Sequence, residues 1–204
     1  MPQLEYQTMP KLDDEHEDKP MNEPNAFLEE ALFKARTILL TGGIDDKQAR
    51  RVCERLLALG SDSDKPILLV ISSPGGHVES GDMIHDMIKF VDAPVKVLGS
   101  GWVASAGALI YAAAKKENRY ALPNTRFLLH EPRGGFGGQA SDIDIQVREI
   151  VRMRERLNKI FANATGQTLE KIKSDTDRDH WMSAEEAVEY GLVGKIVTSK
   201  KEIS

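Results

Sequence analysis

Apolar and polar positions follow two different periods along the chain. A continuous apolar run at 66–72 (PILLVIS) is typical of a parallel strand that is covered on both faces. Shorter apolar runs predict further strands at 37–40, 95–98, 120–122, 126–129 and 193–197. Between the runs, apolar residues recur at helical spacing around 49–57, 83–91 and 104–114. Repeated strand–helix units of this kind predict an α/β domain with a mainly parallel sheet.

From about Asp142 a longer helical pattern interrupts this rhythm. One stripe of the pattern is apolar and its other faces are heavily charged; the stripe consists of Ile143, Val147, Ile150, Leu157 and Phe161. A helix of this length cannot cover its apolar stripe alone, so we expect an arm that reaches toward a neighbouring chain. Farther on, Ser183 and Glu186 form a capping box for a last short helix that ends at Gly191.

The charge of the chain is concentrated in its first residues. Residues 1–24 hold seven acidic residues and two lysines, whereas the remainder balances 25 acidic residues with 25 basic ones. Residues 1–25 also carry four prolines and little to bury, so we expect a disordered acidic extension before a folded domain at 26–204. A body without basic excess is a poor partner for phosphates, which argues against nucleic acid binding.

One uncharged stretch resembles a membrane span in length. It covers 18 residues from Val97 to Ala114, but several glycines and serines interrupt it, so we expect no membrane partner. The one cysteine, Cys53, cannot form an internal disulfide, which suits a reducing compartment. The first residues also lack the apolar run of a signal peptide. We therefore expect a cytoplasmic location.

Two glycine-rich turns follow predicted strands. After the run at 66–72, Gly75 and Gly76 permit positive φ angles and expose backbone N–H groups that can face an oxyanion or an extended peptide. A plain turn into the next helix explains the same residues. In the second turn, Ser105 stands where a strand gives way to a helix, a position that suits a nucleophile attacking a carbonyl. A packing or capping serine is the alternative.

His130 and a downstream acidic segment complete the candidate chemistry. His130 ends the strand pattern RFLLH, where an imidazole can face a cleft and accept a proton, although a purely structural histidine fits equally well. In the segment 175–181, one of three aspartates can orient that imidazole, and a solvated charge run is the alternative. The histidines lack metal-ligand spacing and the glycine loop at 134–138 lacks a phosphate-binding lysine, so we expect neither metal nor bound cofactor.

The order and spacing of these motifs carry more information than any one of them. The runs ISSPGG, VASAGALI, RFLLHEP, GQASDIDI and WMSAEEAVEYGLV resemble the proteolytic subunit of the Clp protease, ClpP, from about Arg36 to Val197. The gaps of 25 residues from Ser105 to His130 and 49 residues from His130 to Asp179 are similar to those of that family. The resemblance implies a crotonase-like spiral of β-β-α units with a helix–loop handle at about 131–165.

The resemblance also implies a role for each motif residue. Ser105 would be the nucleophile, His130 the general base and Asp179 the orienting acid of a serine endopeptidase. The N–H groups of Gly76 and Ala106 would form the oxyanion hole. Gly75, Gly134 and Gly135 would bind the substrate. Asp177 and Arg178 would lie at the contact between two rings.

By the same resemblance, the chain would work inside a large particle. Two stacked heptameric rings, about fourteen subunits, would enclose the sites, either as a homo-oligomer or mixed with a paralogue. An AAA+ unfoldase of the Clp family would spend ATP and feed unfolded polypeptides to them. The alternatives are a structural or regulatory subunit of a mixed ring and a crotonase-type acyl-CoA enzyme. Leu68 and Val70 replace tyrosines that many members carry, so we expect a divergent paralogue.

Overall fold

The computed structural model describes residues 26–133 and 137–203, and it contains one seven-stranded sheet. The expected N-terminal extension at 1–25 lies outside the described residues. The strands are β1 (Thr37–Thr41), β2 (Ile67–Ser73), β3 (Val95–Ala104), β4 (Arg119–Ala121), β5 (Arg126–Leu129), β6 (His180–Met182) and β7 (Lys195–Ile196).

Seven α-helices and two short 3₁₀ helices in the described residues connect these strands. The α-helices are α1 (Ala26–Lys34), α2 (Asp46–Asp62), α3 (Val78–Phe90), α4 (Ala106–Tyr111), α5 (Ala140–Thr165), α6 (Leu169–Asp175) and α7 (Ala184–Tyr190). The 3₁₀ helices are η1 (Lys116–Asn118) and η2 (Lys200–Glu202). The capping box predicted for the last helix is present, since the Ser183 side chain accepts from the N–H of Glu186 and Gly191 ends the helix in the left-handed conformation.

The sheet is parallel except at one edge. Its main path runs β1-β2-β3-β4-β7, and β5 branches from β3 to pair in the antiparallel sense with β6. The branch arises because β3 is ten residues long. Its first half pairs with β4 from Val97 to Gly99, and its second half pairs with β5 from Trp102 to Ala104. Gly101, at φ 66°, lies between these two halves.

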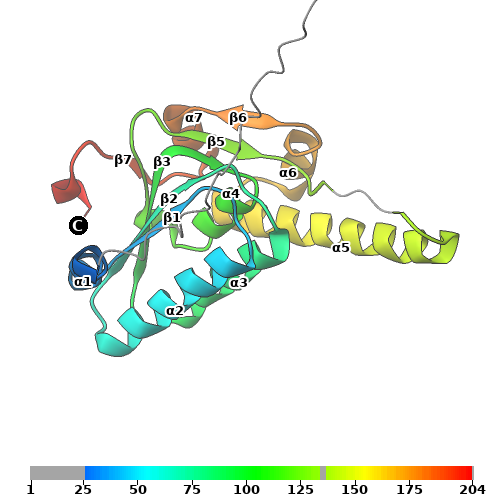
Figure 1. The fold of residues 1–204 in the computed structure, drawn as a ribbon. Coiled ribbons are helices and arrows are strands. Elements are labelled where there is room, and N and C mark those ends of the chain that lie inside the picture. The colour runs from blue at the N-terminus through cyan, green and yellow to red at the C-terminus, as the bar shows by residue number, and fades with distance from the viewer. Residues whose placement is uncertain (1–25, 134–136, 204) are drawn as a thin grey trace, which may run out of the picture.

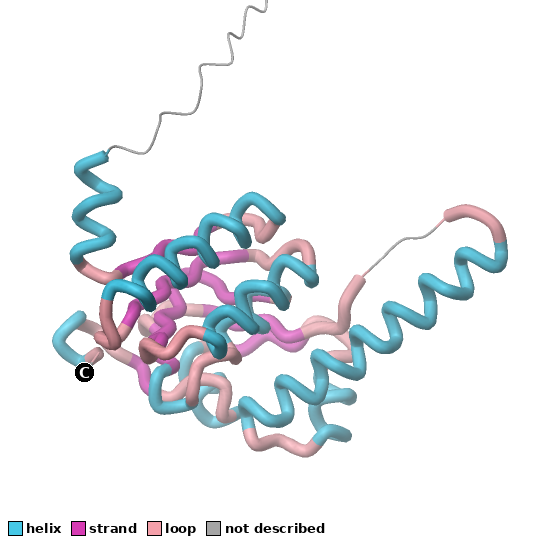
Figure 2. The backbone as a smooth tube through the Cα atoms, turned by 90° about the horizontal axis from the view of Figure 1, so that it is seen from below, coloured by secondary structure: helices cyan, strands magenta, loops and turns pink. Residues whose placement is uncertain are grey.

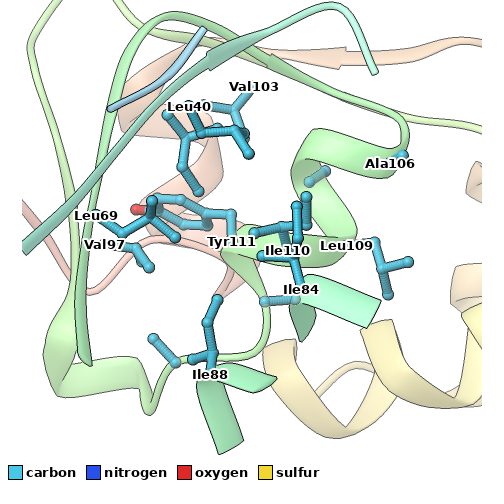
Figure 3. Packing of buried hydrophobic residues seen from close by; sticks show 14 of the residues in the cluster. Leu40, Leu69, Ile84, Ile88, Val97, Val103, Ala106, Leu109, Ile110 and Tyr111 are labelled. Carbon is cyan, nitrogen blue, oxygen red and sulfur yellow. The ribbon is translucent and has the colours of Figure 1, made fainter. Parts of the chain in front are cut away.

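A single hydrophobic core fills the space between the sheet and helices α2, α3 and α4. Figure 3 shows Leu40 and Leu69 of the sheet packed near Tyr111 of α4, with Ile84 and Ile88 of α3 beyond. The Tyr111 hydroxyl donates to the carbonyl of Tyr120 at 2.8 Å, so this buried polar atom is satisfied. Burial of this core holds α4, and thus the turn before it, firmly against the strand ends.

The other face of the sheet is less well covered than the apolar pattern predicts. In β2 the buried residues alternate with half-buried ones, so Leu68 and Val70 keep part of their surface. In β1 the side chain of Leu39 is 45% exposed. Among the described residues, one face of β2 is thus fully covered and the other only in part, so the expectation of a strand covered on both faces is met on one face alone.

The long helix predicted from about Asp142 is α5, and it extends beyond the rest of the molecule. Its C-terminal half packs on the body through Leu157 and Phe161, whereas its N-terminal half projects outward (Figures 1 and 2). The apolar side chains of that outer half are 37–54% exposed; they are Ile143, Ile145, Val147 and Val151. The predicted apolar stripe is thus real, but only its inner part has a partner in this chain.

Some elements differ from the sequence-based prediction. The helix expected at 104–114 is confined to Ala106–Tyr111, because β3 continues to Ala104 as a partner of β5. Helices α1 and α6 and strand β6 were not predicted. Both helices contain good helix formers, and a side-chain N-cap at Thr168 starts α6. Strand β6 is only three residues long, which is too short for a period to be recognised.

Candidate active site

Ser105 occupies a strained turn between β3 and α4. Its backbone angles are φ 54° and ψ −121°, a combination that residues other than glycine rarely adopt. The turn is held from both sides, because the Ser105 N–H donates to the carbonyl of Leu128 at 3.0 Å and the Ser105 carbonyl accepts from the N–H of Ala108 at 2.9 Å. A sharp strand-to-helix turn of this kind presents a side chain at the strand end, as nucleophilic serines require.

The loop that contains Gly75 and Gly76 packs directly against this turn. A Cβ atom on Gly75, which has φ 97°, would lie 2.6 Å from the Ser105 Cβ and 3.1 Å from the Ala106 nitrogen. A Cβ on Gly76 would lie 2.2 Å from the carbonyl oxygen of Ile44. No side chain fits at either place, so the two glycines predicted from the sequence are required for the loop to approach Ser105.

The backbone N–H groups of Gly76 and Ala106 are the oxyanion-hole donors expected from the resemblance. Ala106 is the first residue of α4, where a helix offers its N–H no internal acceptor. Around Gly76, the loop is fixed by bonds from Ile44 N–H to Gly75 O at 2.9 Å and from His77 N–H to Ile44 O at 2.8 Å. Neither bond uses the N–H of Gly76. Backbone donors of this kind suit the stabilisation of an oxyanion.

His130 and Asp179 form a hydrogen-bonded pair. Strand β5 ends one residue before His130 and β6 begins one residue after Asp179, and the pairing of Leu129 with His180 brings the two side chains together. The Nδ1 atom of His130 lies 3.0 Å from Oδ1 of Asp179. A carboxylate only accepts, so the imidazole donates from Nδ1 and keeps the lone pair of Nε2 free to take a proton.

Ser105 and His130 line the same small pocket. The pairing of β3 with β5 places Ala104 opposite Leu128, and His130 lies two residues farther along the chain. The walls of this pocket are otherwise mainly apolar; they comprise Val78, Ala106, Leu109, Pro132, Leu157 and Phe161. The structure thus brings together Ser105, Ala106, His130 and Asp179, which are far apart in the sequence.

The other site residues inferred from the sequence lie close to Asp179 or outside the described residues. Asp177 accepts from Nη2 of Arg154 at 3.3 Å, and Arg178 donates to the carbonyl of Asp177 at 3.3 Å. Both residues belong to the loop that carries Asp179 and directly precede Asp179 in the sequence. Gly134 and Gly135 lie outside the described residues.

Other histidines have partners elsewhere. His77 Nδ1 lies 2.8 Å from the Ser80 hydroxyl and 3.3 Å from the Asp46 carboxylate, at the start of α3. His85 pairs with its neighbour Asp86, and the ring of His180 packs against Tyr190. These contacts give His77, His85 and His180 structural roles and leave His130 as the imidazole beside Ser105.

Cys53, the other candidate nucleophile by residue type, has the wrong surroundings. It is 3% exposed within α2, and burial raises the pKa of its thiol to about 11. A thiol with that pKa remains protonated near neutral pH and is a poor nucleophile.

The part of the chain that the structure describes contains no candidate metal site and no candidate membrane span. Within residues 26–133 and 137–203, no three His, Cys, Asp or Glu side chains are grouped so that they could hold a metal ion. None of the helices in the same residues combines the length and apolar character needed to cross a membrane.

Sequence reasoning missed one residue that touches the site. The guanidinium of Arg133 contacts Oδ1 of Asp179, the oxygen that also accepts from His130. Its spacing of three residues from His130 gave no signal, because the segment after His130 is irregular and its course cannot be derived from a period.

Comparisons with known proteins identify relatives along almost the whole chain. A model of the Clp protease family matches residues 22–200. The "ATP-dependent Clp protease proteolytic subunit 2" of Gluconobacter oxydans is 61% identical over 191 residues, which are 93% of this chain and 86% of the relative. The protein of the same description from Pseudomonas aeruginosa is 62% identical over 179 residues, which are 88% of this chain and 89% of the relative.

Solved structures agree with this result. A point mutant of ClpP1 from Listeria monocytogenes superposes with a TM-score of 0.82 at 50% identity, and the match covers 87% of this chain and 99% of the mutant chain. ClpP1 from the same organism gives a TM-score of 0.79 with the same identity and coverage. The ClpP-like α/β fold expected from the sequence is therefore confirmed. The chain belongs to the Clp protease family, whose members are serine endopeptidases.

Proposed function

We propose that Ser105, His130 and Asp179 are the catalytic residues of this endopeptidase. The observation that carries the proposal is the 3.0 Å bond from His130 to Asp179 beside a serine held in a strained strand-to-helix turn. In this arrangement Nε2 of His130 takes the Ser105 proton as the hydroxyl oxygen attacks the peptide carbonyl. Asp179 keeps the imidazole in the required tautomer and stabilises the imidazolium that forms.

The remaining steps use the same groups. The backbone N–H groups of Gly76 and Ala106 stabilise the oxyanion of the tetrahedral intermediate. His130 then gives its proton to the leaving amine, and the acyl group stays on the Ser105 oxygen. A water molecule, deprotonated by His130, attacks this ester and releases the second product with the serine restored. None of these steps requires a metal or a bound cofactor.

The substrate is proposed to be an extended, unfolded polypeptide. Gly75 lets its loop approach Ser105 closely, and a peptide strand is proposed to pair with the backbone of that loop. Gly134 and Gly135 are proposed as the opposite side of the same groove. The pocket at Ser105 is small and its walls are mainly apolar.

The two alternative functions predict different results. A purely structural subunit needs no reactive serine, and a crotonase-type enzyme must bind an acyl-CoA. Family membership and the assembled pair of His130 and Asp179 favour the peptidase over both.

The function is tested by incubating the purified chain with short fluorogenic peptides without ATP. We expect hydrolysis of the peptides, little degradation of a stably folded protein, and no heat of binding for an acyl-CoA in calorimetry. Binding of an acyl-CoA together with inert peptides would overturn the proposal.

We further propose that the chain assembles into two stacked heptameric rings, as a homo-oligomer or mixed with a paralogue. The relatives are named as subunits of a protease, which places them in an assembly. The apolar side chains of the outer half of α5 and one face of the sheet stay exposed among the described residues, so a partner surface is proposed to cover them. Asp177 and Arg178 are proposed to lie at the contact between the rings.

Substitution of Val147 with aspartate is expected to separate the rings and to lower peptidase activity. Val147 is 45% exposed on α5, so the charge does not disturb the fold of one subunit but is buried when the helix meets a partner. Sedimentation velocity measures the particle size. The matched control is Gln146→Asp, one residue away on the same helix and also exposed, which is expected to stay assembled. A Val147→Asp protein that remains both fully assembled and active would contradict the proposed assembly.

An AAA+ unfoldase of the Clp family is proposed as the partner that spends ATP. The names of the relatives describe an ATP-dependent protease, whereas the sequence of this chain has no P-loop for binding ATP. The single cysteine is consistent with a proposed cytoplasmic location.

A further inference from the structure

The carboxylate of Asp179 has two donors on one oxygen. Its Oδ1 accepts from Nδ1 of His130 at 3.0 Å and contacts the guanidinium of Arg133. The two donors come from the same short segment, because Arg133 follows His130 by three residues. A backbone bond of 2.8 Å from Glu131 N–H to Thr176 O ties this segment to the loop that carries Asp179.

The charged groups around this pair are arranged so that Arg133 is the cation in contact with Asp179. Arg154, on α5, lies 3.1 Å from the carboxylate of Glu131 and 3.3 Å from that of Asp177. Arg178 donates to the backbone carbonyl of Asp177. The two neighbouring acids, Glu131 and Asp177, are thus paired with Arg154 rather than with Arg133.

A guanidinium at this position restrains the carboxylate. Its charge-assisted hydrogen bond keeps Oδ1 of Asp179 directed at Nδ1 of His130. The side chains of Arg133 and Asp179 are 67% and 42% exposed, so solvent weakens this contact without removing it.

We propose that Arg133 is a positioning residue that acts through Asp179 and keeps the imidazole of His130 oriented toward Ser105. The inference rests on the proposed roles of Ser105, His130 and Asp179. The contact of Arg133 is to the carboxylate of Asp179, so its loss is expected to lower kcat and to leave KM unchanged.

The test measures kcat and KM separately for a short peptide at low salt, for the wild type and for Arg133→Gln. We expect the kcat of the variant to fall roughly 2- to 5-fold with KM unchanged, as an exposed ion pair permits. Arg133→Lys, which keeps the charge, is expected to restore most of the wild-type kcat. At about 1 M salt, the difference between wild type and Arg133→Gln is expected to shrink. An unchanged kcat, or a lysine variant that behaves like the glutamine variant, would overturn the proposal.

Two controls separate a local charge effect at Asp179 from a general effect of losing an arginine. Arg50→Gln removes a different exposed arginine that pairs with Glu54 on α2, and its kcat is expected to match that of the wild type. Arg133→Met serves as a second neutral variant of similar length. Sedimentation reports whether the variants assemble, and loss of assembly in both neutral variants would assign Arg133 a structural role instead.

Failure of the inference and failure of the proposed function give different results. If Ser105→Ala and His130→Ala remain active, the proposed catalytic residues are wrong, and the inference is overturned with them. If both are inactive and the kcat of Arg133→Gln is unchanged, only the role of Arg133 is wrong.

Discussion

Replacement of Ser105 with alanine is expected to lower kcat/KM for short peptides by about 10⁴-fold. The hydroxyl oxygen of Ser105 forms the acyl bond in the proposed mechanism, and the turn that holds it offers no substitute. Alanine keeps the Cβ atom that packs against Gly75, so the loop and the turn are expected to stay in place. The residual rate, measured with a fluorogenic peptide, would reflect substrate binding and the oxyanion donors alone.

The control for this variant is Ser61→Ala. Ser61 is exposed in α2, and its loss is expected to leave the rate unchanged. Sedimentation should show the same particle for the wild type and both variants. A Ser105→Ala protein with more than about a tenth of the wild-type rate would exclude Ser105 as the nucleophile.

Replacement of His130 with alanine is expected to cost nearly as much as loss of Ser105, again about 10⁴-fold. Without the imidazole, none of the described side chains that line the pocket can accept the serine proton at neutral pH. Because both residues act in one step, the double variant is expected to be little worse than either single variant. Asp179→Asn is expected to cost less, since it leaves the base in place and only weakens its orientation.

His77→Ala is the matched control, because His77 is the other imidazole near the Gly75–Gly76 loop. Its ring contacts Ser80 and Asp46 at the start of α3, so its loss is expected to leave most of the activity. Rates are measured as for Ser105→Ala. A double variant whose loss equals the product of the two single losses would contradict a shared step, and an inactive His77→Ala would reopen the choice of base.

Much of the fold follows from local patterns. The apolar run at 66–72 and the strand at 126–129 coincide with β2 and β5 to within a residue, because each is bounded by turn residues. The capping box at Ser183 fixes the start of α7 for a local reason as well. Local patterns do not determine where a strand ends when its last residues pair with a distant strand. Strand β3 extends to Ala104 because it pairs there with β5.

Some features of the candidate site can likewise be predicted from the sequence, and others require the structure. The sequence indicates a glycine loop, a serine at a strand end and a histidine at another strand end, and chemistry then limits their roles. Their distances depend on pairings between strands, and β6, which places Asp179 beside His130, has too short a pattern to be predicted. Family resemblance therefore supplied Asp179, whereas the contact of Arg133 with it required the structure.

The half-exposed residues of the sheet show a further limit. A continuous apolar strand indicates two covered faces, but it does not say whether the cover belongs to the same chain. Leu68 and Val70 in β2 are only half-buried among the described residues, whereas the alternate residues are fully buried. The pattern is thus compatible with a second chain as the missing layer, and periodicity cannot distinguish the two cases.

The most direct test of the central claim is to locate the bond formed by a fluorophosphonate. This probe phosphonylates an activated serine, so mass spectrometry of the digested protein identifies the modified residue. We expect one adduct per chain, on Ser105, and no adduct on Ser105 in the His130→Ala variant. An unmodified Ser105 in an assembled wild-type protein, or an adduct on another residue, would contradict the account.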